Sequence, residues 1–455
     1  MKTIFISSFH PFISKNILNT DVFKIFRARQ DLKIVLLVPF VRKEFFEANY
    51  GSDNVAVEGI DTTRFSNSRS NGFFSWAAFF FVYSHWIRRK RRDYLNANWS
   101  IYNFIKFRSF MVLTWFLSGH KALNGIFRSL DWRYSPGDFF KKQYDRYKPD
   151  LVFSTDIYTD FDQAVIKEAK MRKTRTIGMV RSWDNNFSKG LMRFLPDKLV
   201  ANNEVIKKEA IELHDYPEND IFIGGLPQFD DYLKAPFQNR EDYFKSIGGN
   251  PNKRVVLFAP GSPEEFGGVN LAIPRVLKEA KQKGILPEDI QFLISNHPHR
   301  PNDFSELAGD KDFIVRWLGT KLGGRENVEF SSENSRQLAD MIYYSDIVIW
   351  MASSIGLDAL VFNKPEIVVN FDLEKIPYWK SVRRFHDEDH MRAFFKTGGI
   401  KMAGKLDDVV NFVRDYLKNP RLDEEGRTKA REQQLWKVDG KSGERIANFI
   451  LSFLS

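Results

Sequence analysis

Short apolar runs alternate with longer amphipathic runs along most of the chain. The opening shows this pattern, because Thr3–Ser7, Lys33–Val38 and Val55–Glu58 are apolar runs of strand length with amphipathic segments between them. After an interruption, the alternation resumes at Leu151–Ser154 and continues toward the end of the chain. Strands that alternate with helices are typical of parallel sheets covered by helices. The pattern therefore predicts an α/β fold of the doubly wound, Rossmann-like type.

The alternating pattern falls into two blocks. A chain of 455 residues with 43% hydrophobic content is long enough to bury two separate cores. The first block spans 1–227 and ends in a Gly-Gly-Leu-Pro turn, and the second spans 253–430. The segment between them, 228–252, is predicted to be a linker, and the last residues, 431–455, contain one further predicted helix. We therefore expect two domains.

One segment, 72–134, departs from the alternation and is rich in Phe, Trp, Tyr, Lys and Arg. Phe73–Trp86 is mostly apolar but too short to span a bilayer as a helix, and the basic run Ile87–Arg92 follows at once. A second apolar run occupies Ser109–Ser118. Aromatic surface beside basic residues is typical of helices that lie in a membrane interface, so an anionic membrane surface is a predicted partner. The alternatives are an insertion packed into the N-terminal core and a surface for single-stranded nucleic acid.

Charge and composition narrow the classes of partner. The net charge is +10 and the aromatic content is 15%, which favours acidic partners. No known nucleic-acid-binding module is present, so nucleic acid is not a predicted partner. The absence of cysteine excludes disulfides, a thiolate metal site and a thiol nucleophile. Met1–Ser8 becomes polar too early for a signal peptide and is predicted to be a strand, so we expect a cytoplasmic protein at the inner face of the plasma membrane.

The most informative stretch predicts a strand at Ile347–Trp350, a polar turn with Ser353 and Ser354, and a helix at Ile355–Val361. The first N–H groups of a helix have no partner within the helix, and the helix dipole favours negative charge there. The two serine hydroxyls add donors at the same point. Asp358 lies one turn further on, where a carboxylate reaches the hydroxyls of a ribose in dinucleotide folds. The stretch predicts a nucleotide-phosphate site, and the alternative is an ordinary capped helix.

Two other predicted strands in this block end in similar turns. The strand at Val255–Ala259 is followed by Gly261 and Ser262, and the next apolar run is followed by a turn that contains His297 and Arg300. Ligands of open α/β sheets bind outside the carboxyl ends of the strands. His297 is therefore predicted to contact or protonate a donor phosphate, and Arg300 to add positive charge to it. The alternative for His297 is a residue of a structural turn.

The order of these motifs, APGS, then NHPHR, then MASSIGLDAL with NKP, resembles the C-terminal half of a GT-B glycosyltransferase. The stretch is most similar to the CDP-glycerol glycerophosphotransferases of teichoic acid synthesis and to GT-B sialyl- and Kdo-transferases. These families pair a His-Pro motif with a Ser-Ser motif around the donor phosphate. The resemblance covers Val255–Asp372 best and 72–134 least. It implies two Rossmann-like domains facing a cleft, with the donor nucleotide in the C-terminal domain, the acceptor in the N-terminal domain and a last helix in 431–455 that crosses back.

The predicted general base is Asp184, which follows a strand of the first domain. Its surroundings, Ser-Trp-Asp-Asn, resemble the Trp-His-Gly motif of the glycerophosphotransferases, whose His is the proposed base; here Asp replaces the His and Asn the Gly. A carboxylate within hydrogen-bond reach of a hydroxyl can take its proton. The alternative is that Asp184 caps a helix or stabilises a turn. His10, Asp156 and Asp160 are further candidates at strand ends of the same domain.

The predicted function is that of a metal-independent transferase. It would move a sugar or a polyol phosphate from a nucleotide-activated donor to a hydroxyl of a glycan or lipid-linked acceptor, in bacterial surface polysaccharide or glycolipid synthesis. No DxD motif follows a strand, and His386–His390 does not match HExxH, so no metal site is predicted. No cofactor is predicted either. The alternatives are an enzyme like the UDP-sugar 2-epimerases, which share this fold, and a non-catalytic protein that binds membrane or polymer.

Overall fold

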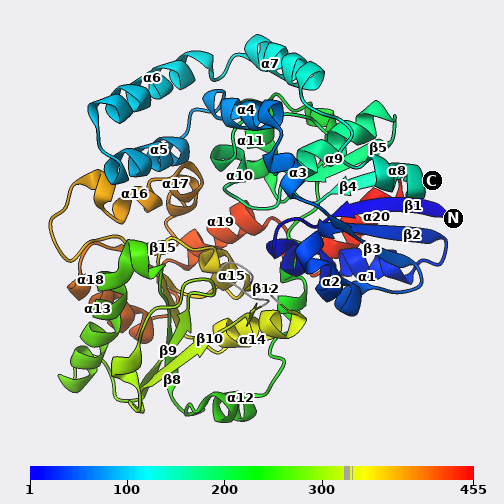
Figure 1. Ribbon diagram of the computed structural model, residues 1–455. Helices are drawn as coiled ribbons and strands as arrows, with labels where there is room; N and C mark the ends of the chain where they lie inside the picture. The colour runs from blue at the N-terminus through cyan, green and yellow to red at the C-terminus, as the bar shows by residue number, and fades with distance from the viewer. Residues whose placement is uncertain (322–327, 330, 455) are drawn as a thin grey trace. The chain divides into compact units, whose positions relative to one another are not determined.

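Figure 1 shows the computed structural model of the chain, which describes residues 1–321, 328–329 and 331–454. The chain folds into two compact units, each built around its own parallel sheet. Unit 1 comprises Met1–Gln228 together with Asp439–Ser455, and unit 2 comprises Phe229–Val438. The predicted α/β fold with two Rossmann-like domains is therefore confirmed.

The sheet of unit 1 has seven parallel strands in the order β3-β2-β1-β4-β5-β6-β7. Their bounds are β1 Lys2–Ser7, β2 Leu32–Pro39, β3 Val55–Ile60, β4 Leu151–Ser154, β5 Arg175–Met179, β6 Lys198–Ala201 and β7 Ile221–Ile223. The central strands are buried on both faces, which explains why they read as continuous apolar runs. The strand order reverses between β1 and β4, and this switch point is where ligands of such sheets bind.

Helices on both faces cover the sheet of unit 1 (Figure 1). The main ones are α1 Asp21–Ala28, α2 Lys43–Tyr50, α8 Lys141–Tyr147, α9 Asp160–Met171, α10 Asn185–Ser188, α11 Glu204–His214 and α20 Ser442–Leu451. The last helix, α20, packs against α1, and its residues Ile446 and Ile450 are fully buried in the same core as β1 and β2. Each contributes about 1.5–3 kcal/mol through burial. The end of the chain is therefore a structural element of unit 1.

The segment 72–134 is helical. α3 Thr63–Ser66 precedes it, and its elements are most of α4 Arg69–Ala77, a 3-10 turn Ala78–Phe80, α5 His85–Ala97, α6 Ile101–Leu117 and α7 Lys121–Tyr134. Part of the segment is packed, as the alternative interpretation held: Arg193 bonds to Asp131 on α7 at 2.7 Å and to Asn71 on α4 at 2.9 Å, and all three side chains are buried. By contrast, most of α6 is exposed. In the described residues, no helix is both long and apolar enough to cross a bilayer.

The sheet of unit 2 has six parallel strands in the order β10-β9-β8-β13-β14-β15. Their bounds are β8 Arg254–Ala259, β9 Ile290–Asn296, β10 Phe313–Trp317, β13 Ile347–Trp350, β14 Glu366–Val369 and β15 Ile400–Ala403. The short strands β11 Thr320–Lys321 and β12 Val328–Glu329 pair separately. The unit's helices are α12 Arg240–Ile247, α13 Pro263–Gln282, α14 Ser332–Tyr343, α15 Ile355–Val361, α16 Arg383–His386, α17 Asp389–Phe395, α18 Leu406–Lys418 and α19 Glu424–Leu435.

The segment predicted as a linker, 228–252, is structured instead. It contains α12 and belongs to unit 2 apart from its first residue. Its attachment is polar, because the Asp340 carboxylate accepts the backbone N–H of Phe237 and the Tyr344 hydroxyl donates to the carbonyl of Gln238. The local sequence does not predict these contacts, because they join residues about a hundred positions apart.

Candidate functional site

Three polar turns meet at one edge of the sheet of unit 2. Strands β9, β8 and β13 are neighbours and parallel, so the turns that follow them lie at the same carboxyl edge. These turns carry Gly261 and Ser262 after β8, His297 and Arg300 after β9, and Ser353 and Ser354 after β13. The strand order of this sheet reverses between β8 and β13, which makes their carboxyl ends the expected ligand position.

Three buried asparagines, which the sequence analysis did not single out, hold the first two turns together. Asn270 on α13 bonds to both the N–H and the C=O of Gly261, at 3.1 and 3.0 Å, and it also donates to Asn302 at 2.7 Å. Asn296 accepts the N–H of His297 at 2.9 Å and the N–H of Asn302 at 2.8 Å. The sequence feature that could have identified Asn296 as a residue of the site is its position directly before the His-Pro pair. Asn270 and Asn302 are far apart in sequence, and no sequence motif indicates that they belong to the site.

Gly261 is required at its position by packing. A Cβ atom there would lie 2.2 Å from the ring of Phe266, in the first turns of α13. Any side chain would therefore push the β8 turn away from α13 and disturb the asparagine contacts. The neighbouring Ser262 is buried and precedes α13, which begins with Pro263.

His297 is a neutral hydrogen-bond donor. Burial lowers its pKa to about 4, and the nearby His299 and Arg300 act in the same direction. Its Nδ1 accepts the backbone N–H of Arg300 at 3.1 Å, which leaves the proton on Nε2. The sequence analysis predicted that His297 contacts or protonates a donor phosphate, and a neutral Nε2–H suits the contact. The adjacent Arg300 is half-exposed and lies 3.6 Å from Glu264, so its charge is partly balanced.

We expect His297 to titrate near pH 4 when the carbon-bound imidazole proton is followed by NMR, with the signal assigned through His297→Gln. Because the folded-state pKa lies below the ordinary 6.5, the unfolded chain takes up the proton first. The free energy of unfolding should therefore fall as the pH drops from about 6.5 toward 4. A midpoint near 6.5 in the folded protein would contradict this.

The third turn places two serine hydroxyls before α15. The Ser353 hydroxyl accepts the N–H of Ile355 at 3.4 Å, and the exposed Ser354 directly precedes the helix. Asp358, predicted to bind a ribose, is only 3% exposed and accepts a hydrogen bond from the Tyr232 hydroxyl at 2.7 Å. The structure thus gives Asp358 a buried partner in its own unit, and a ribose would have to replace that contact.

A second group of polar residues lies at the carboxyl edge of the sheet of unit 1. Asp156, after β4, accepts a hydrogen bond from Arg181 Nε at 2.7 Å, and both side chains are buried. His10, after β1, lies close enough to feel both charges; burial first and then Arg181 lower its pKa to about 3. Its Nδ1 accepts the N–H of Phe12 at 3.2 Å, so His10 is neutral and its proton is on Nε2.

Asp184 lies near this edge, between β5 and α10. Its two carboxylate oxygens accept one hydroxyl each, from Ser182 at 2.6 Å and from Ser188 at 2.9 Å. These bonds fix the orientation of the carboxylate. The next residue, Asn185, is fully buried, and neither of its amide atoms has a hydrogen-bond partner in the described structure. Polar groups without partners are uncommon in protein cores, and a role in binding or catalysis is one explanation for them.

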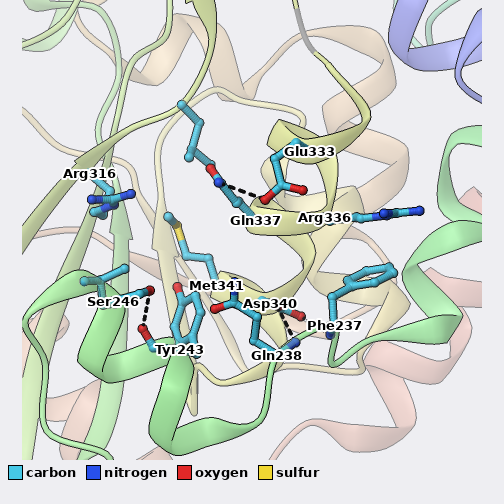
Figure 2. A pocket seen from close by; sticks show the side chains of 12 residues that line it. Phe237, Gln238, Tyr243, Ser246, Arg316, Glu333, Arg336, Gln337, Asp340 and Met341 are labelled. Atoms are coloured by element: carbon cyan, nitrogen blue, oxygen red, sulfur yellow. Dashed lines mark hydrogen bonds between the residues drawn. The ribbon is translucent and has the colours of Figure 1, made fainter.

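A cavity of about 240 Å³ lies elsewhere in unit 2, between α12, α14 and the end of β10 (Figure 2). Asp340 lies on its wall and holds the backbone of Phe237 and Gln238, at 2.7 and 3.2 Å. Figure 2 shows Arg316 and Arg336 on separate walls. The cavity is lined by none of the residues predicted to bind the donor. The cavity and the three turns are therefore different places in unit 2.

The His386–His390 segment, set aside as a metal site, forms the end of α16 and the start of α17. His386 is buried, and its Nδ1 lies 3.0 Å from the side-chain oxygen of Asn370. Across the residues that the structure describes, no group of three His, Asp or Glu side chains is placed to hold a metal ion. Independence from metal stays a prediction.

The fold is that of the GT-B proteins, and similar solved structures span nearly the whole chain. A putative UDP-N-acetylglucosamine 2-epimerase from Listeria monocytogenes matches with a TM-score of 0.58 at 11% identity, over 100% of this chain and 97% of that one. The UDP-GlcNAc 2-epimerase from Neisseria meningitidis gives 0.56 at 12%, over 99% and 100%. The wall teichoic acid polymerase TagF gives 0.53 at 12%, over 99% and 88%. At these identities the likeness shows the fold alone.

The sequence itself decides between the enzymes that share this fold. The profile of the CDP-glycerol:poly(glycerophosphate) glycerophosphotransferase family matches residues 169–452, well over half of the chain. The chain belongs to this family, and the protein is a transferase. No curated protein matches the chain. The resemblance to the glycerophosphotransferases is therefore confirmed, and the likeness to the epimerases is one of fold.

Proposed function

We propose that the protein transfers glycerol phosphate from CDP-glycerol to a hydroxyl of a cell-envelope polymer, without the help of a metal ion. The observation that carries this proposal is the family match over residues 169–452, which includes all three turns of unit 2 and Asp184. Of the two donor classes that the sequence left open, the match favours the polyol phosphate over the sugar.

In this proposal unit 2 binds the donor. The Nε2–H of His297 and the hydroxyls of Ser353 and Ser354 donate hydrogen bonds to the donor phosphates, and Arg300 adds charge. Preorganised donors of this kind stabilise the negative charge that develops on a leaving phosphate. The asparagine contacts between Asn270, Asn296 and Asn302 keep the β8 and β9 turns in place before the donor arrives.

Unit 1 would supply the acceptor half of the chemistry. The acceptor hydroxyl oxygen forms a bond to the phosphorus of the glycerol phosphate group, the bond from that phosphorus to the bridging oxygen breaks, and CMP leaves with the electron pair. Asp184 takes the hydroxyl proton. The cations that act on His10, namely Arg181, Lys189 and Arg42, suit an acceptor that is itself a chain of phosphates.

We also propose that the protein works at an anionic membrane surface, on the cytoplasmic side, with a lipid-linked acceptor. The support is the composition and exposure of α5 and α6. Together they carry seven Lys and Arg residues and one carboxylate. Large apolar side chains on α6 are exposed, among them Ile101, Trp115 and Phe116 at 70%, 70% and 61%. Apolar side chains beside cations suit a helix that lies in the lipid headgroup region.

The direct test is a transfer assay with the purified chain, CDP-glycerol and a short poly(glycerol phosphate) acceptor, in the presence of EDTA. We expect CMP release together with acceptor elongation. Loss of activity that Mg²⁺ restores would overturn the metal-free mechanism. Conversion of UDP-GlcNAc without any acceptor would favour the epimerase alternative, and donor binding without turnover would favour a non-catalytic protein.

The donor site has its own test, because His297→Ala and Ser354→Ala each remove one hydrogen bond to a phosphate. A charge-assisted hydrogen bond contributes about 1.5–3 kcal/mol, so calorimetry should show CDP-glycerol affinity reduced roughly tenfold or more by each change. Arg336→Ala, at the separate cavity on α14, serves as the control and should leave the affinity unchanged. Unchanged affinity in both site variants would show that the donor binds elsewhere.

A further inference from the structure

An apolar groove of about 340 Å³ lies in unit 1 between α5, α6 and the end of α4. Its walls include Trp76, Phe80, Leu95, Phe107 and Phe110, and most of the exposed lining is carbon. The volume falls in the range of about 300–1,000 Å³ that is usual for small-molecule sites. The groove is far in sequence from every residue assigned above to donor or acceptor, so it needs an explanation of its own.

Two cations line this apolar groove. The Arg91 guanidinium lies 4.2 Å from the centre of the Phe110 ring and 5.8 Å from that of Phe79. Its pKa is lowered, because burial removes water from the charge. Lys106 lies on the α6 side and is exposed. No carboxylate in the described part of the chain forms an ion pair with Arg91 or Lys106, so an anion at this groove would meet two available charges.

The single acidic residue of α5 and α6 already forms an ion pair with another cation. Asp93 pairs with the buried Arg89 at 3.0 Å. The groove therefore combines an apolar interior with positive charge that is not balanced locally. A ligand that matches both properties has an alkyl chain and an anionic head. A peptide helix would match the apolar walls but would have to bring its own acids.

The groove also adjoins the exposed apolar residues of α6. Val112 and Leu113 are neighbours in sequence; Leu113 lines the groove, and Val112 is 61% exposed. A helix that is apolar on all sides is normally buried, and exposed apolar patches of this kind mark interaction surfaces. Figure 1 shows α5 and α6 running beside each other, joined by a short turn. An alkyl chain of a lipid, leaving a bilayer in contact with α6, would thus have a short path into the groove.

We propose that this groove binds one acyl chain of an anionic membrane phospholipid, with the lipid phosphate held by Arg91 and Lys106. The proposal rests on the membrane association proposed above and adds a specific lipid site to it. One acyl chain bound in the groove would fix the orientation of unit 1 on the membrane. Electrostatic attraction to a charged surface alone does not fix that orientation.

The test uses the full chain with vesicles of phosphatidylcholine and phosphatidylglycerol that contain a phosphatidylglycerol with a photoreactive acyl chain. After irradiation, mass spectrometry should place the main adducts on peptides that contain Phe107 or Phe110. The variant Arg91→Gln with Lys106→Gln should reduce these adducts by about tenfold or more, the loss expected for charge-assisted contacts. The matched control, Arg88→Gln with Lys90→Gln, removes the same charge from exposed positions of α5 and should keep the adducts in the groove when these are counted per vesicle-bound protein, as they are for both variants.

Three outcomes would overturn the site. Adducts spread evenly over the exposed face of α6, adducts unaffected by the Arg91 and Lys106 changes, or equal labelling by a phosphatidylcholine probe would each show that no selective groove exists.

If wild type does not bind vesicles at all, the membrane proposal fails and the groove is tested separately by native mass spectrometry with monomeric lysophosphatidylglycerol. Binding there supports the site, whereas no binding, or equal binding of glycerol phosphate alone, rejects it. A lipid-free dimer that blocks labelling would identify a second copy as the occupant.

Discussion

Asp184→Asn is expected to reduce transfer by a factor on the order of 10²–10⁴ while donor binding stays normal, since this is the usual contribution of a positioned acid or base. The change is conservative in this setting. The Asn oxygen can still accept from Ser182, and its amide can donate to the Ser188 hydroxyl, so the contacts with these two serines are kept. The change removes the negative charge and, with it, the ability to take a proton.

The measurement is single-turnover CMP release at saturating acceptor, which reports the chemical step. Asp145→Asn is the matched control, because Asp145 is an exposed carboxylate of the same unit that bonds to Arg172 at 2.7 Å and has no assigned role. It should retain most of the activity. If Asp184→Asn turns over at nearly the wild-type rate, the base lies elsewhere, and Asp156 and His10 at the same sheet edge become the next candidates.

Reversal of charge on α5 and α6 should abolish flotation with anionic vesicles at low salt. The suitable variant changes the exposed Arg88, Lys90 and Arg108 to Glu. Each cation near the surface contributes about 1 kcal/mol, and each reversal adds a repulsion in place of that attraction. Arg89 must be left intact, because it is buried and paired with Asp93. A reversal there would unfold α5 and give a false positive.

The control for this experiment carries the same net charge. It changes Lys208, Lys283 and Lys405 to Glu, which are exposed lysines outside the 72–134 segment. This control should float like wild type, and wild-type binding should weaken as salt rises because the attraction is screened. Equal flotation of both variants, or no flotation of wild type, would show that the segment is not a membrane surface, and a soluble acceptor would then be favoured.

Periodicity predicted most strands of both sheets because these strands are buried on two faces, and a doubly buried strand is a continuous apolar run. It could not predict the state of 72–134. The apolar residues of α4 and α5 are partly packed against α7, while most of those of α6 face outward, and both patterns look alike in a sequence. Burial depends on which other segment arrives to cover a face, and local composition does not contain that information.

The same limit applies to the candidate site. The turns that carry His297 and the Ser353–Ser354 pair could be placed from the sequence, because they directly follow apolar strands. The partners of these residues could not. Tyr232, which bonds to Asp358, lies 126 positions away. Asn270 and Asn302 join two turns only after β8 and β9 have paired. The lowered pKa of His297 is likewise a consequence of burial that appears only in the folded chain.

The position of α20 in unit 1 has a consequence for the way this chain is made. Unit 2 is inserted between the first 228 residues and the final helix of unit 1. Ile446 and Ile450 cover one face of the sheet of unit 1. During synthesis on the ribosome this face stays exposed until about two hundred further residues, those of unit 2, have been added. Exposed apolar surface of this kind favours aggregation and chaperone binding during synthesis. A chain truncated before Ser442 should therefore accumulate as an insoluble or chaperone-bound product, even though every residue assigned to donor and acceptor would still be present.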